Sequence, residues 1–437
     1  MAPSKNKTLL KNITSLGLVQ VVNYIFPLIT IPYVSRIIGP EGFGEINYIT
    51  AFVSYFILLI SYGFDFTATR KIAVDPDNLE MRSKVFSEVT SARILLFIIS
   101  MAAFMICIGV LPLLKGNLML SSILFLNVIS VLLTPQYVFQ GLQKLPILSL
   151  VTILKGIINT SLIFLFVTKK DDLLLYAGIG VFSNFLISLI SILYVLFVIK
   201  IKFSFYSIKH SLNILNEVRL VFFSSIVFSL YTTTNIIVLG LFSEAKTIGY
   251  YTTAVSFIMI VQGVVNIPLS SSLYPYIGRA FSESQENGII KLRKIAPIIF
   301  YFTAAVCLGI LILAPFVIFL IYGKSFEGSI ITVQILSFLP LISAMSNLMG
   351  IQTMLNLNMD NLFLKITSIA ACFSIALNLL LCHYFSYIGT TISYLFTELL
   401  ICFSFYVVLR KKGLFLFEKD NFKFNNVMLR IKNLKNI

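Results

Sequence analysis

Long apolar runs dominate this chain, and short polar connections separate them. A helix needs about 20 residues to cross the roughly 30 Å hydrocarbon core of a bilayer. Several connections contain glycine or proline, such as Gly39 with Pro40, which is typical of tight turns between antiparallel helices. The pattern predicts twelve membrane-spanning helices, at residues 13–37, 45–66, 86–111, 117–141, 145–168, 172–199, 218–241, 249–273, 295–321, 328–352, 362–385 and 387–409.

The predicted helices form two groups of six, because the longest basic connection follows the sixth. We therefore expect an all-α polytopic membrane protein with two six-helix lobes. A shift of 203 residues aligns Glu41 with Glu244 and Tyr48 with Tyr251, which indicates a repeat with its axis along the membrane normal. The expected domains are an N-terminal lobe at 1–200, a cytoplasmic linker at 201–217, a C-terminal lobe at 218–410 and a basic cytoplasmic tail at 411–437.

Composition and charge fit a membrane protein. Of 437 residues, 58% are hydrophobic and 12% charged, and the net charge is +15. The basic residues are scattered over many short connections and form no single face, so we expect no nucleic-acid partner. If both termini are cytoplasmic, the connections on that side hold 25 Lys and Arg and those on the other side 6. Such a bias predicts cytoplasmic termini.

Enzymatic and metal chemistry find no support in the pattern. No connection exceeds roughly two dozen residues, which leaves no room for a catalytic domain. The cysteines lie in apolar runs, where they are typical small buried side chains, and Cys382 beside His383 lacks the further ligands that a metal site needs. We expect no metal, no cofactor and no enzyme activity.

Charged residues within the predicted spans are the candidate functional residues, because each costs about 2.5–3.5 kcal/mol at the centre of a membrane helix. Arg93 and Lys155 lie inside the third and fifth spans, and neither has an acidic residue one turn away. Their partner is either an anionic ligand or, for Arg93, an interhelical ion pair with Asp65. Glu398, in the twelfth span, is either a proton or cation site or a neutral acid hydrogen-bonded between helices.

The first two spans carry a second group of candidates. Pro27 and Pro32 interrupt the backbone hydrogen bonding of the first span and predict a hinge. Arg36 and Arg70 lie at the outer and inner ends of these two spans, and Glu41 and Asp65 lie beside them. Two readings stay open for the arginines: alternating pairing with these acids during transport, or anchoring at the membrane interface.

The sequences PLITIPYVSRIIGPEGFG, FILLISYGFDFTATRKIA and YYTTAVSFIMIVQGVVNIPLSSSLYP carry a family resemblance. With the length and the span count, they resemble the Wzx-type O-antigen and polysaccharide-repeat flippases of the multidrug/oligosaccharidyl-lipid/polysaccharide exporter superfamily. The first-span motif contains Arg36, Gly39 and Glu41, and the motif that closes the second span contains Asp65 and Arg70.

The resemblance implies two six-helix lobes around a central cavity. It implies a flippase that moves undecaprenyl-pyrophosphate-linked oligosaccharide from the cytoplasmic to the periplasmic leaflet of the bacterial inner membrane by alternating access, with proton or cation coupling. The polysaccharide polymerase and chain-length regulator are the implied protein partners. The alternative is a cation-coupled multidrug exporter of the same superfamily. The implied substrate-binding residues are Arg93, Lys155, Arg36 and Arg70, the coupling or gating residues are Asp65, Glu398 and Glu41, and the hinge residues are Pro27 and Pro32.

Overall fold

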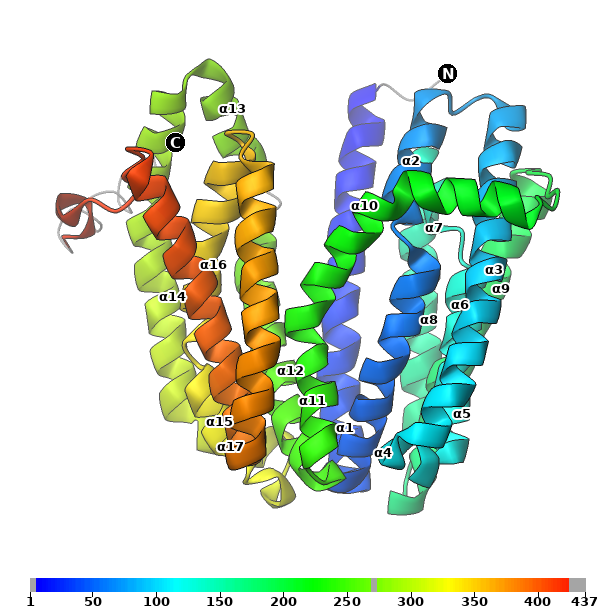
Figure 1. The fold of residues 1–437 in the computed structure, drawn as a ribbon, viewed down its shortest axis with the longest axis horizontal. Helices are drawn as coiled ribbons and strands as arrows, with labels where there is room; N and C mark the ends of the chain where they lie inside the picture. Colours follow the sequence, from blue (N-terminus) through cyan, green and yellow to red (C-terminus); the bar gives the residue numbers. More distant parts are fainter. Residues whose placement is uncertain (1–4, 269–272, 424–437) are drawn as a thin grey trace. The chain divides into compact units, whose positions relative to one another are not determined.

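The described residues form helices joined by turns and short loops, and none of these residues forms a strand (Figure 1). The computed structural model describes residues 5–268 and 273–423, so the end of the predicted basic tail lies outside the described residues. The first elements are α1 (Lys5–Ser61), α2 (Phe64–Val74), α3 (Leu79–Val110), α4 (Pro112–Gly116), α5 (Leu118–Phe125), α6 (Asn127–Leu133), α7 (Gln136–Gly141), α8 (Leu145–Phe166), η1 (Lys170–Asp172), α9 (Leu173–Leu193) and η2 (Tyr194–Val198). The later elements are α10 (Ile208–Thr232), α11 (Thr234–Phe242), α12 (Ala245–Pro268), α13 (Tyr274–Glu283), α14 (Gln285–Ile321), η4 (Lys324–Phe326), α15 (Ser329–Leu336), α16 (Leu339–Met349), η5 (Gly350–Leu355), α17 (Asp360–Lys411) and η6 (Lys419–Phe422).

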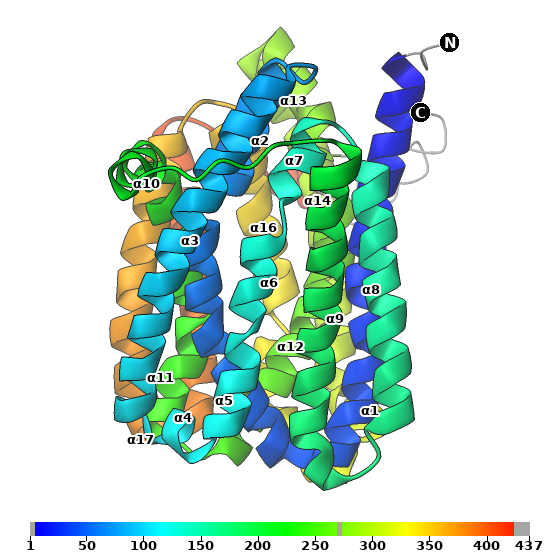
Figure 2. The ribbon, with the colours of Figure 1, turned by 90° about the vertical axis from the view of Figure 1, so that its right-hand side faces the viewer.

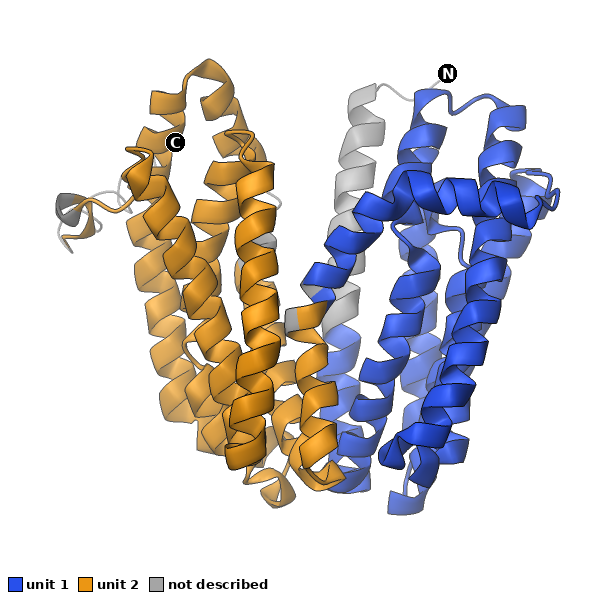
Figure 3. Cartoon of the chain, in the orientation of Figure 1, with its two compact units in different colours: residues 1–229 blue, residues 230–437 orange. Residues whose placement is uncertain are grey.

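The chain divides into two compact units, unit 1 (residues 1–229) and unit 2 (residues 230–437), with the boundary inside α10 (Figure 3). Residues 201–207, in the predicted linker, are extended, and α10 begins at Ile208. The role of this segment as a cytoplasmic linker between two six-helix lobes stays a prediction.

The core of unit 1 is built around α1, which packs against α8, α6 and α3, while α2 packs against α7 (Figure 2). Ile49, Val53, Phe56 and Ile60 follow one another at spacings of three or four and are all buried, so they form one face of α1. Phe56 meets Phe125 of α5 edge to face at 5.5 Å between ring centroids, a favourable arrangement for aromatic rings.

Unit 2 has its own core between α12, α14, α16 and α17. Leu292, Ala296, Leu348 and Phe405 belong to one cluster of buried apolar side chains. A buried hydrogen bond also joins α17 to α11, because Asn378 Nδ2 donates to Asn235 Oδ1 at 3.0 Å. This bond offsets the lost hydration of one donor and one acceptor, while Asn378 Oδ1 has no hydrogen-bond partner among the described residues.

Among the described residues, nine helical stretches are long and apolar enough to cross a membrane. Two of them, Ile25–Val74 with 50 residues and Asp360–Lys411 with 52, have about twice the length that one crossing requires. Each contains a backbone break, at Gly39 with φ 72° and at Ser386 with φ 50°. Glycine suits the first break because it has no Cβ to oppose positive φ. Both breaks fall at predicted connections between spans, and the count of twelve spans stays a prediction.

Four spans that the apolar pattern predicted as continuous are broken in the described residues. Residues 45–66 lie in α1 and α2, and residues 218–241 in α10 and α11. Residues 117–141 form α5, α6 and α7, and residues 328–352 lie in α15, α16 and the π-helical turn η5. The break between α6 and α7 lies at Thr134 and Pro135, since proline has no N–H to continue the helical hydrogen bonds. An apolar run therefore located each membrane segment without revealing where its helix is interrupted.

Candidate functional site

Arg93 of α3 is enclosed by unit 1, with 3% of its side chain exposed. Its Nη2 lies 3.2 Å from Asp65 Oδ1, and its Nη1 donates to the carbonyl oxygens of Thr134 at 3.0 Å and Val131 at 3.4 Å. The guanidinium also lies over the ring of Tyr137, 5.3 Å from its centroid. One carboxylate, two carbonyls and one aromatic face therefore stabilise this buried charge.

The backbone breaks of unit 1 explain this arrangement. Gly63 adopts φ 78° in the break between α1 and α2. Asp65 therefore lies in the first turn of α2, where the helix dipole favours a negative charge. A Cβ on Gly63 would also overlap the side chain of Val221. At the other side, α6 ends just before Thr134, and its terminal carbonyls point to a cation. Arg93 thus joins two interrupted helices.

A second layer of hydrogen bonds holds the same junction. Thr69 Oγ1 of α2 lies 2.5 Å from the carbonyl oxygen of Asp65 and 3.1 Å from Gln140 Oε1 of α7. Asp65 itself keeps 35% of its side chain exposed, whereas Arg93 is almost fully covered. Of the two arrangements expected for Arg93, the interhelical ion pair with Asp65 is therefore the one present in this conformation.

Lys155 lies near the middle of α8, about 15 Å along the helix from Leu145 at 1.5 Å per residue. Its side chain is half-buried, and among the described residues it has neither an ion pair nor a hydrogen bond. One turn further, Asn159 has a buried Oδ1 that accepts no hydrogen bond from the described part of the chain. An uncompensated cation beside an unused acceptor, within an apolar helix, is the arrangement expected of a polar ligand site.

The remaining candidates of the first spans lie at the surface of unit 1. Arg36 and Arg70 are exposed. Glu41 lies 3.7 Å from Lys170, with 63% and 68% of the two side chains exposed, so this pair contributes little to stability. Asp65 pairs with Arg93, and the described part of the structure records no ion pair between Asp65 and Arg70.

Pro27 and Pro32 lie inside α1, which shows no non-helical backbone before Gly39. Nearby hydroxyl groups bond to other carbonyls of α1, since Thr30 donates to the oxygen of Phe26 at 2.9 Å and Ser35 to that of Pro32 at 3.1 Å. A hinge at these prolines stays a prediction.

Glu398 lies in the second segment of α17, in unit 2, and is half-buried. Within the described residues it forms no ion pair. No group of three or more His, Cys, Asp or Glu side chains in that part of the chain is placed to hold a metal ion. The role of Glu398 in proton or cation coupling stays a prediction.

Sequence reasoning missed the groups that surround these charges. Thr69 and Tyr137 of the Arg93 junction were not identified, and Gln140 and Asn159 stood out only as two of many intramembrane amides without an individual role. Pro135 was the available signal for the first site, because a proline within an apolar run marks helix carbonyls that need another donor. For the second site, the signal was the spacing of four residues between Lys155 and Asn159, which places both on one helix face.

An all-helical bundle with intramembrane charges at interrupted helices has the architecture of a membrane transporter. Solved structures agree with this class. The chain is similar to "Lipid II flippase MurJ, inward closed conformation", with a TM-score of 0.70 and 13% identity, covering 97% of this chain and 92% of that one. It is also similar to an outward-facing multidrug resistance MATE family transporter of the MOP superfamily, with a TM-score of 0.56 and 15% identity, covering 94% and 96%. These similarities show the fold.

The family follows from sequence. The family model described as "Polysaccharide biosynthesis protein" matches residues 9–281, more than half of the chain, so the chain belongs to this family. Two relatives share the name "Putative O-antigen transporter". The one from Escherichia coli (strain K12) is 29% identical over 90% of this chain and 95% of its own length. The one from Shigella dysenteriae is 26% identical over 90% and 97%. The chain is thus a multi-pass membrane transporter and not an enzyme.

Proposed function

We propose that this protein is a flippase for undecaprenyl-pyrophosphate-linked oligosaccharide units of a surface polysaccharide such as O-antigen. In this proposal it moves them from the cytoplasmic to the periplasmic leaflet of the bacterial inner membrane by alternating access through a cavity between two lobes, with both termini cytoplasmic. The family and the names of the two relatives support the substrate class. The observation that carries the proposal is Lys155, a half-buried cation in mid-helix without an anionic partner among the described residues.

Lys155 supplies the attraction that a diphosphate needs to leave the membrane surface. Electrostatic attraction strengthens where water is scarce, so a single ammonium group in an apolar helix is an effective phosphate ligand. The free oxygen of Asn159 one turn away suits a sugar hydroxyl, which donates a hydrogen bond. One cation without a rigid cage binds moderately, which a transported ligand requires because it must also leave.

Arg93 enters this proposal through an exchange of partners. In the described conformation Asp65 holds it, and Asp65 is the accessible member of the pair. A diphosphate that replaces Asp65 would bind Arg93 and free the carboxylate. Such an exchange gives Asp65 a gating role, while Arg36 and Arg70 meet the substrate at the two membrane faces. Glu41 and Glu398 remain the further coupling candidates, and Pro27 and Pro32 the hinge.

Reconstituted vesicles that contain a fluorescent lipid-linked oligosaccharide provide the test. Removing a charge-assisted contact costs about 1.5–3 kcal/mol, so we expect Lys155→Gln to slow flipping roughly 10- to 100-fold and Lys155→Arg to keep part of the rate. Lys144→Gln, just before the same helix, is the matched control and should flip like the wild type. Equal rates for Lys155→Gln and the control would overturn the site.

The multidrug exporter is the second candidate, supported by the similarity in fold to the MATE family transporter. It predicts that a deletion strain loses efflux of cationic dyes and keeps its surface polysaccharide. The buried charges of unit 1 favour the flippase, because Arg93 and Lys155 would repel a cationic drug and only Asp65 would attract it. Loss of the polysaccharide with unchanged dye efflux is the expected result.

A further inference from the structure

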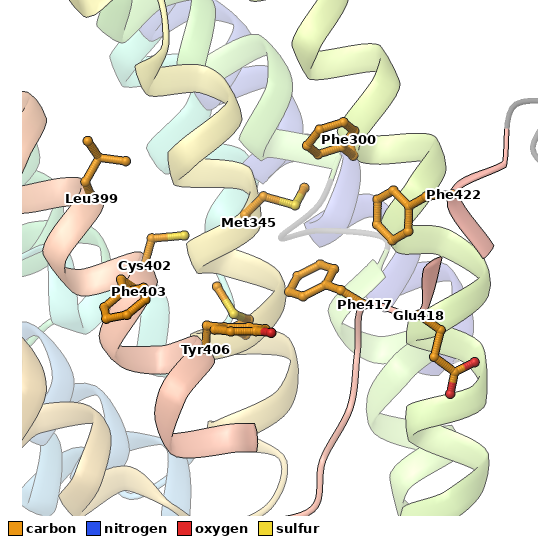
Figure 4. Close-up of a pocket in the computed structure, with 10 residues that line it drawn as sticks. Phe300, Met345, Leu399, Cys402, Phe403, Tyr406, Phe417, Glu418 and Phe422 are labelled. Carbon is orange, nitrogen blue, oxygen red and sulfur yellow. The ribbon is translucent and has the colours of Figure 1, made fainter. Parts of the chain in front are cut away.

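Unit 2 contains an apolar pocket of about 530 Å³, and its lining residue Leu399 directly follows Glu398 in α17. Phe300 of α14, Met345 of α16 and Cys402 of α17 line it, together with Phe417 beyond the end of α17 (Figure 4). Glu418 is the single charged side chain in the lining. The pocket falls in the size range of small-molecule sites, about 300–1,000 Å³, and is far more apolar than a sugar site would be.

The chain segment that follows α17 closes one side of this pocket. We name residues 412–423 the C-terminal strap. Its Glu418 lies 2.6 Å from Nη1 of Arg293 on α14, and Nε of the same arginine donates to the carbonyl oxygen of Phe415. Tyr301 Oη donates to the carbonyl oxygen of Phe422 at 2.6 Å. These contacts fix Phe417 and Phe422 over the pocket, so the strap is a wall of the pocket.

On another side the pocket opens to the surface of unit 2. Leu399 and Phe403 line it and are 44% and 65% exposed. Both belong to a stretch of α17 that is apolar enough to cross a membrane. Large apolar side chains at this exposure are costly in water and normal against hydrocarbon, so the opening faces lipid chains.

Cationic groups border the pocket at the end of α17. Arg410 Nη1 donates to the hydroxyl of Tyr406 at 3.2 Å, and Tyr406 lines the pocket. Lys411 and Lys412 follow directly and are exposed. An apolar pocket with positive charge at one end matches a lipid that has an anionic head group, since basic residues beside a membrane attract such head groups.

We propose that this pocket holds one acyl chain of a resident anionic phospholipid, whose phosphate lies at Arg410, Lys411 and Lys412. The strap, held by an ion pair and two further hydrogen bonds, gives this chain a fixed wall to pack against. The proposal rests on the apolar lining and the basic rim, and not on the proposed substrate.

Native mass spectrometry of the full chain, titrated with phosphatidylglycerol or phosphatidylcholine of identical acyl chains, tests the pocket. Cys402→Phe fills it, and Cys372→Phe makes the same change at an exposed cysteine of α17 outside the lining. Each methylene kept out of an apolar site weakens binding about fourfold, so we expect more than tenfold weaker retention of phosphatidylglycerol for Cys402→Phe alone. Equal retention by both variants would overturn the pocket as the site.

The head group is tested at the surface, where folding is not at risk. Neutralising Arg410, Lys411 or Lys412 to glutamine should weaken phosphatidylglycerol roughly fivefold per charge and weaken phosphatidylcholine, whose phosphate is offset by its own cation, clearly less. Lys324→Gln, in η4 at the opposite expected face of unit 2, should change neither lipid. Equal loss of both lipids, or displacement of bound phosphatidylglycerol by undecaprenyl phosphate at equal concentration, would contradict a resident anionic phospholipid. Flipping assays with Lys155 variants do not enter this test, so its failure would leave the proposed function standing.

Discussion

At the scale of single residues, the molecule compensates Arg93 within the protein and leaves Lys155 without a compensating anion among the described residues. Arg93 has a carboxylate, two carbonyls and an aromatic face around it. Lys155 has an unused amide oxygen one turn away and no recorded partner. Under the proposed function, Lys155 therefore meets an anionic ligand directly, whereas Arg93 does so only after the ligand replaces Asp65.

This difference predicts the stability of variants. Asp65→Leu leaves the buried guanidinium of Arg93 without its carboxylate, and loss of a hydrogen bond to a charged group costs about 1.5–3 kcal/mol. The double variant Asp65→Leu with Arg93→Met removes both charges and should recover most of that loss. We expect these changes in the free energy of unfolding, measured by denaturant titration in mixed micelles.

An exposed ion pair in the same unit provides the control. Lys71 lies 3.3 Å from Glu217, with 44% and 63% of the side chains exposed, and such pairs contribute about 0–1 kcal/mol. Lys71→Gln and Glu217→Gln should therefore change the free energy of unfolding by less than about 1 kcal/mol. A loss for Asp65→Leu as small as in these controls, or no recovery in the double variant, would contradict the role given to the buried pair.

At the scale of elements, α3 holds the segment that leads from α9 to α10. Ser83, Ser87 and Ser91 accept hydrogen bonds from the backbone N–H groups of residues 202, 204 and 206, at 3.1, 2.9 and 3.0 Å. Four helical residues rise about 6.0 Å, and two extended residues span about 6.6 Å. These two spacings match closely enough for serines one helical turn apart to bind every second amide of the segment. We call Ser83, Ser87 and Ser91 the serine ladder, and it fixes the segment along α3.

Substitution by alanine should affect stability differently at a ladder serine, Ser87, and at a serine of the same helix outside the ladder, Ser100. Ser87 Oγ accepts from the N–H of Ser204 and contacts the carbonyl oxygen of Lys202 at 3.3 Å, so Ser87→Ala should cost about 1–3 kcal/mol. Ser100 is fully buried, and its Oγ has no hydrogen-bond partner in the described residues, so Ser100→Ala should be neutral or slightly stabilising.

Hydrogen exchange of the backbone amides at 202–206 is the direct measurement. We expect Ser87→Ala to speed exchange at residue 204 and its neighbours, whereas Ser100→Ala should leave these amides as protected as in the wild type. Unchanged protection in Ser87→Ala would show that the segment is held by contacts other than the ladder.

The positions of the elements could be predicted from the sequence much better than their contacts. Apolar runs located the membrane segments. The free-energy cost of a charged side chain in a membrane helix was enough to identify Arg93, Lys155, Asp65 and Glu398 as unusual. Membrane helices are apolar on all sides, however, so their pattern does not reveal which face meets which neighbour. The pairing of Arg93 with Asp65 could therefore be stated only as one of two alternatives. The hydrogen bond from Arg93 to the carbonyl oxygen of Thr134 could not be predicted either, because it depends on where α6 ends in the packed unit.

At the scale of the whole molecule, burial can be compared at the positions that the shift of 203 residues aligns. Tyr48 in unit 1 and Tyr251 in unit 2 are both 1% exposed, and Ala51 and Ala254 are also buried. Thr50 and Thr253 differ, since Thr50 is exposed and Thr253 is buried. The repeat between the two halves stays a prediction, and the two units form separate cores.

The number of times that the chain crosses the membrane decides whether its two halves can form equivalent lobes. A straight helix of 50 residues would measure about 75 Å, far more than a hydrocarbon core of about 30 Å, so the stretches with breaks at Gly39 and Ser386 should each cross twice. Reporter insertions after residues 39, 116, 170, 323 and 386 should then report the periplasm. Insertions after residues 76, 143, 209 and 358, and a fusion at the C-terminus, should report the cytoplasm. The excess of Lys and Arg on the second side gives the physical reason for this orientation. If insertions after residues 39 and 76 reported the same side of the membrane, the chain would not reverse its direction at Gly39. The count of twelve crossings, on which two equivalent six-helix lobes depend, would then be wrong.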